Sequence, residues 1–367
     1  MAAAVLIAGG GTGGHLFPGV AVAQALRALR PDLALTFVST GKALESRVLA
    51  EAGFNLEPIP ARALRGRGLM ERARALMGLP LACLAAARLI RRLRPALVLA
   101  VGGYAAFPLG VMARLMGVPL AVQEQNALPG LTNRVLARLA RRVFISFPEA
   151  RAHFPAAKCE LAGNPVRADL IAQAQAAAAT RPDPAAEFRV LVLGGSQGAH
   201  SLNLALIAAL THLAGRRQRM FFVHQTGAAD QATVASAYAG HGFRAEVQAF
   251  FGDMGRLYGQ AHLVICRAGA GTLTELAACG RGAVCAPYPH AAGDHQTLNA
   301  RSRVAAGAAI LVPDAELSGE RVAGLIAGLM DEPARLAAME AAARAQGRPQ
   351  AARDIARQCL SLMREAA

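Results

Sequence analysis

The stretch VLIAGGGTGG occupies residues 5–14, and a similar stretch, VLVLGGSQGA, occupies residues 190–199. Each begins with a short apolar run, turns through glycines and continues with the periodicity of a helix. Apolar runs, glycine clusters and helical periodicity alternate along the rest of the chain, a pattern typical of a parallel sheet with crossover helices. The sequence therefore predicts an α/β fold with two similar domains, each opening with a strand, a glycine loop and a helix.

The length and composition also favour two domains. The chain has 367 residues, of which 54% are hydrophobic and 17% charged, so sizeable cores can form and disorder is excluded as the main state. We place a hinge in the stretch LAGNPVR, between a first domain of residues 1–163 and a second of residues 164–349. A final helix, residues 350–367, could cross back to the first domain. Ligands of open α/β sheets bind beyond the carboxyl ends of the strands, so two facing domains would place the site in the cleft between them.

Positive charge is concentrated in the first half of the chain. Residues 1–163 hold 20 basic and 8 acidic side chains, and the rest hold 19 and 16, which favours an anionic partner for the first half, either nucleic acid or a membrane surface. The six cysteines form no C-x-x-C pair and are typical of a reducing compartment. No basic segment precedes the first apolar run, and glycine-rich turns interrupt the uncharged residues 2–26, 95–113 and 190–210. We therefore expect a soluble or peripheral protein.

The first glycine loop runs from Gly9 to His15 and satisfies the pattern G-x-G-x-x-G after a strand. Its missing side chains would let a diphosphate approach the backbone, and helix-start amides attract anions. The alternative is a tight turn needed only for packing. A dinucleotide site also needs an acidic residue after the second strand, and residues 39–41 (Ser-Thr-Gly) supply none, which disfavours NAD. His15, at the start of the helix, is either a structural histidine or a base that takes a proton from an attacking hydroxyl.

Two further polar clusters follow strands of the first domain. Gly102, Gly103 and Tyr104 come after the strand of residues 96–101, where a turn with a packed tyrosine is the simpler interpretation. The next strand leads into residues 123–126, Gln-Glu-Gln-Asn. Side-chain donors and acceptors at the carboxyl end of a strand suit sugar hydroxyls, so we predict a sugar contact there.

The second domain has a glycine loop, GGSQGA at residues 194–199, and a denser stretch, CRAGAGTLTE at residues 266–275. The loop offers backbone amides and the Ser196 hydroxyl to a phosphate. Thr272 and Glu275 have capping-box spacing, so Glu275 either caps its helix or accepts hydrogen bonds from ribose hydroxyls. The sequence contains no D-x-D triplet. We therefore expect no metal, and predict that helix dipoles, hydroxyls and arginine, with Arg167 a candidate, neutralise a leaving diphosphate.

A basic segment, residues 62–94, contains nine Arg and one Glu. Within it, the apolar run LMGLPLACL at residues 76–84 is bounded by Arg74 and Arg88. Such a patch suits an interfacial membrane contact, because its apolar part enters the headgroup boundary and the guanidinium groups meet anionic lipid. A core helix with a solvated basic face is the alternative. Nucleic-acid binding is disfavoured, because no aromatic residues are interleaved for base stacking.

Together these motifs resemble one family, the peptidoglycan N-acetylglucosaminyltransferases of the GT-B fold, which convert lipid I to lipid II with UDP-GlcNAc. The resemblance covers most of the chain in the expected order, through residues 9–19 (GGGTGGHLFPG), 102–104, 124–134 (EQNALPGLTNR), 163–167, 194–199 and 266–299. It implies an inverting transfer in which the muramyl 4-hydroxyl attacks the anomeric carbon and UDP leaves, without a cofactor or metal. It also implies a peripheral protein at the cytoplasmic face of the membrane, because the polyprenyl chain of the acceptor stays in the bilayer.

The resemblance further implies where the substrates bind. UDP-GlcNAc would lie mainly on the second domain, with its ribose on Glu275 and its uracil beside the backbone of Phe251. The lipid diphosphate would lie near the first glycine loop. His15 is the first candidate for the general base and Glu124 the second. The residues implied to contact substrate are Thr12, Gly13, Gly14, Tyr104, Asn126, Arg167, Ser196, Phe251, Ala270, Gly271, Thr272, Leu273, Thr274, Glu275 and Gln296.

The sequence departs from the family pattern at two places. Residues 271–274 are Gly-Thr-Leu-Thr where relatives have Leu-Thr-Val-Ser, and His295 stands where a second glutamine can occur. These changes affect single phosphate and sugar contacts. Two other functions remain open, a UDP-GlcNAc 2-epimerase of the same fold and a non-catalytic module that senses nucleotide-sugars at the membrane.

Overall fold

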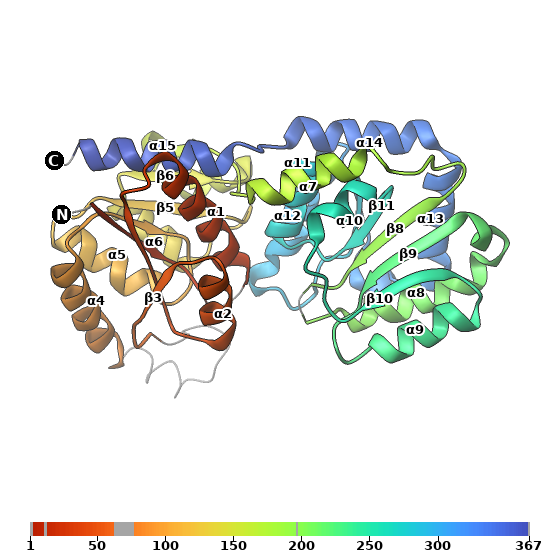
Figure 1. Cartoon of the computed structure of the whole chain (residues 1–367), viewed down its shortest axis with the longest axis horizontal. Helices are drawn as coiled ribbons and strands as arrows, with labels where there is room; N and C mark the ends of the chain where they lie inside the picture. Colours follow the sequence, from red (N-terminus) through yellow and green to blue (C-terminus); the bar gives the residue numbers. More distant parts are fainter. Residues whose placement is uncertain (1–2, 11–12, 62–76, 196, 366–367) are drawn as a thin grey trace. The chain divides into compact units, whose positions relative to one another are not determined.

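Each half of the chain is an α/β unit built on a parallel sheet, so the predicted fold class is confirmed (Figure 1). The computed structural model describes residues 3–10, 13–61, 77–195 and 197–365. The first compact unit comprises Met1–Arg167 and Pro349–Ala367, and the second comprises Ala168–Arg348. The division follows Arg167 rather than residue 163, because the buried Asn164 side chain accepts a hydrogen bond from Gln123 Nε2 at 3.1 Å and stays with the first unit.

In the described ranges, the first sheet has the strand order β3-β2-β1-β4-β5-β6-β7, and all neighbours are parallel. Its central strands are apolar on both faces, because helices cover both sides of a parallel sheet. Val5 and Ile7 of β1 belong to one core, and Leu6 and Ala8 to the other. The strands are β1 (Ala4–Ala8), β2 (Ala34–Ser39), β3 (Asn55–Pro58), β4 (Pro95–Ala100), β5 (Leu120–Glu124), β6 (Arg142–Ile145) and β7 (Cys159–Leu161).

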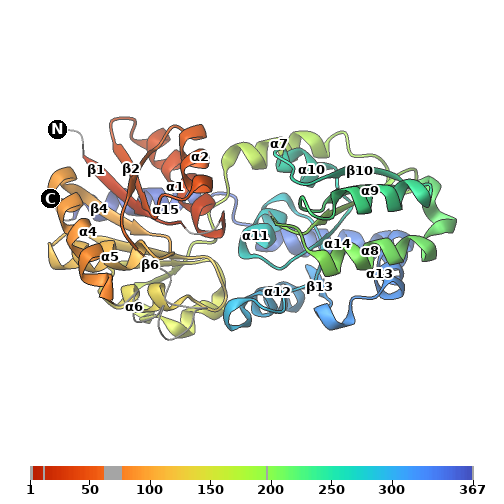
Figure 2. The ribbon, with the colours of Figure 1, turned by 90° about the horizontal axis from the view of Figure 1, so that it is seen from below.

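The helices of the first unit form a layer on each face of its sheet (Figure 2). One layer contains α1 (Gly13–Leu29), α2 (Ala43–Glu51) and α15 (Ala351–Arg364), and the other contains α4 (Leu79–Leu93), α5 (Ala106–Leu115) and α6 (Leu131–Leu139). Short 3-10 turns follow at η1 (Pro148–His153) and η2 (Ala156–Lys158). Although the second unit precedes α15 in sequence, Ile355, Ala356 and Cys359 are buried in the same core as Val5 and Ile7.

The second sheet repeats this arrangement with the order β10-β9-β8-β11-β12-β13 among the residues that the structure covers. Its strands are β8 (Phe188–Leu193), β9 (Met220–Gln225), β10 (Arg244–Gln248), β11 (Leu263–Cys266), β12 (Ala283–Cys285) and β13 (Ala309–Leu311). One face packs on α8 (His200–His212), α9 (Gln231–Gly240) and α13 (Gly319–Asp331). The remaining helices are α7 (Ala168–Ala178), α10 (Met254–Gln260), α11 (Ala270–Cys279), α12 (His295–Ala305) and α14 (Pro333–Gln346), with 3-10 turns η3 (Ala214–Arg219), η4 (Ala292–Asp294) and η5 (Asp314–Glu316).

The three long uncharged stretches form strand, turn and helix, as predicted. They correspond to β1 with α1, to β4 with α5, and to β8 with α8. Within the described part of the chain, no helix combines the length and the apolar character that crossing a bilayer requires.

Candidate active site

The first glycine loop packs backbone to backbone against the loop that follows β4. Gly103 has φ +86°, and a Cβ atom there would lie 2.4 Å from the carbonyl oxygen of Gly10. Gly102 has φ +103°, and its Cβ would lie 2.8 Å from Nδ1 of His15. Any larger residue would separate the two loops and displace the imidazole. Packing therefore explains these glycines, while Gly13 and Gly14 form the first turn of α1, where helix amides lack intrahelical acceptors.

His15 is oriented by Gln125, a buried residue of the 123–126 cluster for which the sequence predicted a sugar contact rather than this role. Its Nδ1 lies 3.0 Å from Oε1 of Gln125. The Gln125 amide is fixed in that direction, because its Nε2 donates to the carbonyl oxygen of Val101 at 2.6 Å. Since Oε1 can only accept, Nδ1 carries the imidazole proton and Nε2 carries the lone pair. This is the tautomer that a general base needs, with the basic nitrogen directed away from its support.

Glu124, the second candidate base, is buried and already accepts several hydrogen bonds. Its Oε1 accepts from the backbone N–H of Asn126 at 2.9 Å and from Nδ2 of Asn126 at 3.2 Å. Its Oε2 accepts from the N–H of Gly130 at 3.2 Å and from Nδ2 of Asn133 at 2.9 Å. A carboxylate with four donors shapes its loop and is poorly placed to accept a substrate proton. The geometry favours His15 over Glu124 as the base.

The other predicted residues of the first unit lie at the same end of its sheet. Tyr104, after β4, is 39% exposed, so the packed tyrosine of the simpler interpretation is not found. Asn126 is half-buried after β5, beside the Glu124 carboxylate. Arg167, also half-buried, is the last residue of the first unit before α7 begins. Thr12 lies outside the described residues, as does Ser196 in the second unit.

The glycine loop after β8 is closely packed against the loop after β9. A Cβ at Gly198, where φ is +81°, would lie 2.1 Å from the carbonyl oxygen of Thr226. Gln225 joins the two loops to a third, because its Nε2 donates to the carbonyl of Gly195 at 2.9 Å and its Oε1 accepts from the N–H of Phe251 at 3.0 Å. The N–H of Phe251 is therefore engaged within the second unit.

The capping-box interpretation of Thr272 and Glu275 is wrong, because α11 begins earlier. Its N-cap is Gly269, and the helix starts at Ala270, so Thr272 is already within the first turn. The amides of residues 270–272 are thus the ones that lack intrahelical acceptors and can bind an anion. Leu273 and Thr274 are buried behind this turn, and Thr274 Oγ1 donates to the carbonyl of Ala270 at 2.7 Å.

Glu275 lies one turn further along α11 and contacts a buried tyrosine. The Tyr258 hydroxyl donates to Oε2 of Glu275 at 2.8 Å. Burial raises the pKa of Tyr258 well above its usual range, and the charge of Glu275 raises it further, so the phenol keeps its proton. Glu275 is therefore an oriented carboxylate near the start of α11 rather than a helix cap.

Two further polar side chains of the second unit, Arg267 and Gln296, follow β11 and β12. Arg267, which follows β11, donates from Nη1 to the carbonyls of Ala286 and Pro287 and to Asp314, and from Nη2 to Ser201 Oγ at 2.7 Å. This arginine supports the loop before α11, a role that sequence reasoning missed. After β12, Gln296 Oε1 of α12 accepts from the N–H of Tyr288 at 2.9 Å, so the amide nitrogen of Gln296 is the end that can donate to a ligand.

The predicted site residues form two groups, one at the carboxyl ends of the strands in each unit. Gly13, Gly14, His15, Tyr104, Glu124 and Asn126 follow β1, β4 and β5, which are neighbours in the first sheet. Phe251, the residues from Ala270 to Glu275, and Gln296 follow β10, β11 and β12 of the second. In the ranges that the structure covers, no cluster of three His, Cys, Asp or Glu side chains is placed to hold a metal ion.

Two units with parallel sheets, each with its candidate residues at the strand ends, have the architecture of the GT-B fold, and the family matches identify the class as glycosyltransferase. Residues 5–145 match the glycosyltransferase family 28 N-terminal domain, and residues 189–356 match the family 28 C-terminal domain. The chain belongs to glycosyltransferase family 28.

Its relatives include proteins named UDP-N-acetylglucosamine--N-acetylmuramyl-(pentapeptide) pyrophosphoryl-undecaprenol N-acetylglucosamine transferase. The chain is 46% identical to the one from Myxococcus xanthus, over 98% of this chain and 93% of the relative. It is also 46% identical to that of Geobacter sulfurreducens, over 96% of each chain. The crystal structure of Acinetobacter baumannii MurG matches with a TM-score of 0.79 and 31% identity, over 98% of this chain and 99% of that one. The resemblance predicted from the sequence is confirmed.

A UDP-GlcNAc 2-epimerase from Neisseria meningitidis also has a similar structure, with a TM-score of 0.70. The two sequences are only 13% identical over 98% of this chain and 100% of that one, so this likeness concerns the fold alone.

Proposed function

We propose that this enzyme transfers GlcNAc from UDP-GlcNAc to the 4-hydroxyl of the MurNAc-pentapeptide of lipid I, giving lipid II and UDP. The observation that carries the proposal is the likeness, over 98% of the chain, to relatives named as that transferase. The first unit would bind the lipid acceptor and the second the nucleotide-sugar. The transfer would invert the anomeric centre, because a single displacement forms the new C1–O bond on the face opposite the departing UDP.

The arrangement of His15 supports its role as the base in this reaction. As the acceptor 4-hydroxyl attacks C1, its proton would pass to Nε2, the nitrogen that the Gln125 contact leaves as the lone-pair donor. The bond from C1 to the β-phosphate oxygen breaks, and negative charge develops on UDP. The first-turn amides of α11 are oriented donors suited to stabilise that charge without a metal ion.

We infer the contacts to the UDP-GlcNAc donor from hydrogen bonds within the second unit. The carbonyl oxygen of Phe251 would accept from uracil N3–H, because the N–H of that residue donates to Gln225. Glu275 would accept from the ribose hydroxyls, and Ser196 with residues 270–274 would face the diphosphate. The amide nitrogen of Gln296 would donate to the sugar, joined by Asn126. Arg167 would approach the nucleotide, and Thr12, Gly13, Gly14 and Tyr104 would line the acceptor side.

One assay tests the reaction as a whole. Radiolabelled GlcNAc should pass from UDP-GlcNAc to a short-chain lipid I analogue in the presence of excess chelator, and no free sugar should form without the acceptor. Loss of transfer on chelation would exclude the metal-free mechanism. Release of free GlcNAc or its epimer without lipid I would identify an epimerase, and tight UDP-GlcNAc binding without turnover would identify a sensor.

The proposed enzyme must reach a substrate held in the membrane, and α4 has the surface for that contact. Leu81 and Leu84 are 59% and 45% exposed, while the opposite side of the helix is buried in the core. Arg88 and Arg91 are exposed further along the same helix. An apolar face continued by guanidinium groups suits the headgroup region of an anionic bilayer. We propose that this surface attaches the protein to the cytoplasmic face of the membrane; residues 62–76 of the basic segment lie outside the described residues.

Reversing the charge of Arg88 and Arg91 together to Glu is expected to weaken binding to anionic vesicles by at least about 30-fold, because each arginine at such a surface contributes about 1 kcal/mol. Arg92 is left in place, since it pairs with Glu57 at 2.7 Å and its reversal would set two carboxylates against each other. Vesicle co-sedimentation, with UDP affinity measured in parallel, gives the result.

A double reversal of Arg217 and Arg219, both exposed on η3 of the second unit, changes the net charge equally and is the matched control. Equal vesicle binding by the two variants would contradict the proposed surface.

A further inference from the structure

Tyr258 is a buried residue of α10 whose hydroxyl contacts Glu275, the residue proposed to bind the ribose. Its side chain is 1% exposed, and its hydroxyl donates to Oε2 of Glu275 at 2.8 Å. The two residues belong to different helices, so the contact fixes the rotation of the carboxylate relative to α10. The same helix begins at Met254, three residues after Phe251, whose backbone is the proposed uracil contact. One short helix thus adjoins both proposed nucleoside contacts.

The close packing of α10 against α7 limits movement of Tyr258. A Cβ at Gly255 would lie 2.6 Å from the carbonyl oxygen of Leu170, and one at Gly259 would lie 2.4 Å from that of Ala174. The two glycines are four residues apart on one side of α10, so they let its backbone approach α7 directly. Tyr258 is adjacent to the second of these contacts.

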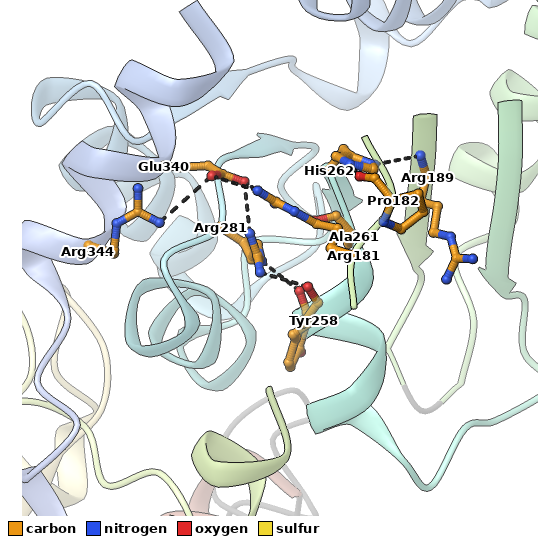
Figure 3. Close-up of polar contacts among 10 residues, drawn as sticks. Arg181, Pro182, Arg189, Tyr258, Ala261, His262, Arg281, Glu340 and Arg344 are labelled. Atoms are coloured by element: carbon orange, nitrogen blue, oxygen red, sulfur yellow. Dashed lines mark hydrogen bonds and ion pairs between the residues drawn. The ribbon is translucent and has the colours of Figure 1, made fainter. Parts of the chain in front are cut away.

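A buried ion cluster holds the other end of α10 (Figure 3). The Arg281 guanidinium donates from Nε to the carbonyl of Tyr258 and from Nη2 to that of Gly259, both at 2.7 Å. It therefore satisfies carbonyls of the last turn of α10 with a positive charge, as the helix dipole favours. Glu340 of α14 accepts from Arg281 at 2.9 Å and from Arg181 at 2.5 Å, which fixes the guanidinium in place. The backbone of Tyr258 is thus held by charged hydrogen bonds.

We infer that Tyr258 is a positioning residue that orients Glu275 toward the ribose and thereby sets the preference for ribose over 2′-deoxyribose. The inference rests on the proposed function, because it takes Glu275 as the ribose ligand. A carboxylate held by a phenol on one oxygen presents its acceptors in one direction before the nucleotide binds. Loss of the phenol removes this anchor, and a less ordered carboxylate makes a weaker contact with the 2′-hydroxyl.

The test is Tyr258→Phe in the full-length protein, with UDP and 2′-deoxy-UDP titrated separately by calorimetry. We expect the Kd of UDP to rise by about tenfold, in line with loss of a hydrogen bond to a charged group, while the Kd of 2′-deoxy-UDP, which offers Glu275 the 3′-hydroxyl alone, rises less. The ratio of the two constants should therefore fall. The kcat at saturating UDP-GlcNAc should stay near that of the wild type, because Tyr258 does not contact the reacting atoms.

The chain offers a matched control in Tyr238→Phe. Tyr238 is also buried in the second unit, but its hydroxyl is 3.1 Å from Nδ1 of His224, which burial keeps neutral by lowering its pKa to about 3. Both substitutions remove one buried phenol hydroxyl, and only Tyr258→Phe should change the ratio. An unchanged ratio in Tyr258→Phe, or an equal change in both variants, would overturn the inference.

Glu275→Ala separates failure of the inference from failure of the proposed ribose contact. If it leaves the preference for UDP intact, Glu275 is not the ribose ligand and both proposals fall. If it removes the preference while Tyr258→Phe does not, only the positioning role is wrong. Should Tyr258→Phe fail to fold, 3-fluorotyrosine in place of Tyr258 tests the same contact. Fluorine makes the hydroxyl a stronger hydrogen-bond donor to Glu275 with little change in side-chain volume, so an unchanged ratio would overturn the inference.

Discussion

Replacing His15 by alanine is expected to lower kcat for GlcNAc transfer by about 10²-fold or more, the range of a general base. The physical reason is the fixed tautomer, because Nδ1 donates to Gln125 and Nε2 is left to take the proton of the acceptor hydroxyl. The affinity for UDP should remain within about twofold, since the proposed nucleotide contacts belong to the second unit. Steady-state kinetics with saturating lipid I analogue, together with UDP titration, measure both effects.

The control is His212→Ala, which removes an exposed imidazole at the C-terminal end of α8. It should leave kcat unchanged. A fall in kcat of less than about tenfold for His15→Ala would show that another group accepts the proton. An independent readout is the ¹⁵N spectrum of the His15 ring, which should show a protonated Nδ1 and a bare Nε2 in the neutral form.

Replacing Glu340 by alanine is expected to lower the free energy of unfolding by about 3–5 kcal/mol, the usual cost of removing one partner from a buried ion pair. Arg281 is 4% exposed and would lose its counter-charge while still buried. Urea unfolding followed by circular dichroism measures the change. Glu316→Ala breaks an exposed pair with Arg321 and should cost less than about 1 kcal/mol. Equal losses in the two variants would refute a stabilising role for the buried cluster.

The same cluster predicts a pH dependence with a definite sign. Burial alone would raise the pKa of Glu340, but hydrogen bonds from Arg181 and Arg281 and their positive charges outweigh burial and hold the pKa below its usual range. A group whose pKa is lower in the folded chain stabilises the fold above its unfolded pKa, and the stabilisation is lost as the pH falls through the folded value. The difference between wild type and Glu340→Ala should therefore be full at neutral pH and shrink below about pH 4.

The fold was predictable because its signals are local. The apolar runs of β1 and β8, and the glycines after each, lie within about ten residues of one another, so the sequence alone indicates strand, turn and helix. The dense stretch before Glu275 was identified for the same reason. The capping-box alternative failed because the spacing of Thr272 and Glu275 also occurs inside a helix, and extended backbone at Gly269 sets the true start.

The contacts that orient the site were not predictable, since they join residues distant in sequence. His15 and Gln125 are 110 residues apart, and no local pattern pairs them. A carboxylate does reach the end of β2, where residues 39–41 carry none: Glu45 of α2 accepts from Ser39 Oγ at 2.7 Å and from the N–H of Lys42 at 2.9 Å. These hydrogen bonds hold α2 against the end of β2. They form only because the folded chain turns back after β2 and brings Glu45 to Ser39.

The place of α15 in the first core has a consequence for synthesis. Its side chains Ile355, Ala356 and Leu362 are buried with those of β1 and α1, so the first unit is assembled from segments that lie before and after the second unit in sequence. The second unit is continuous and can acquire its structure on the ribosome first. Until α15 is synthesised, the core of the first unit lacks the apolar side chains that this helix contributes.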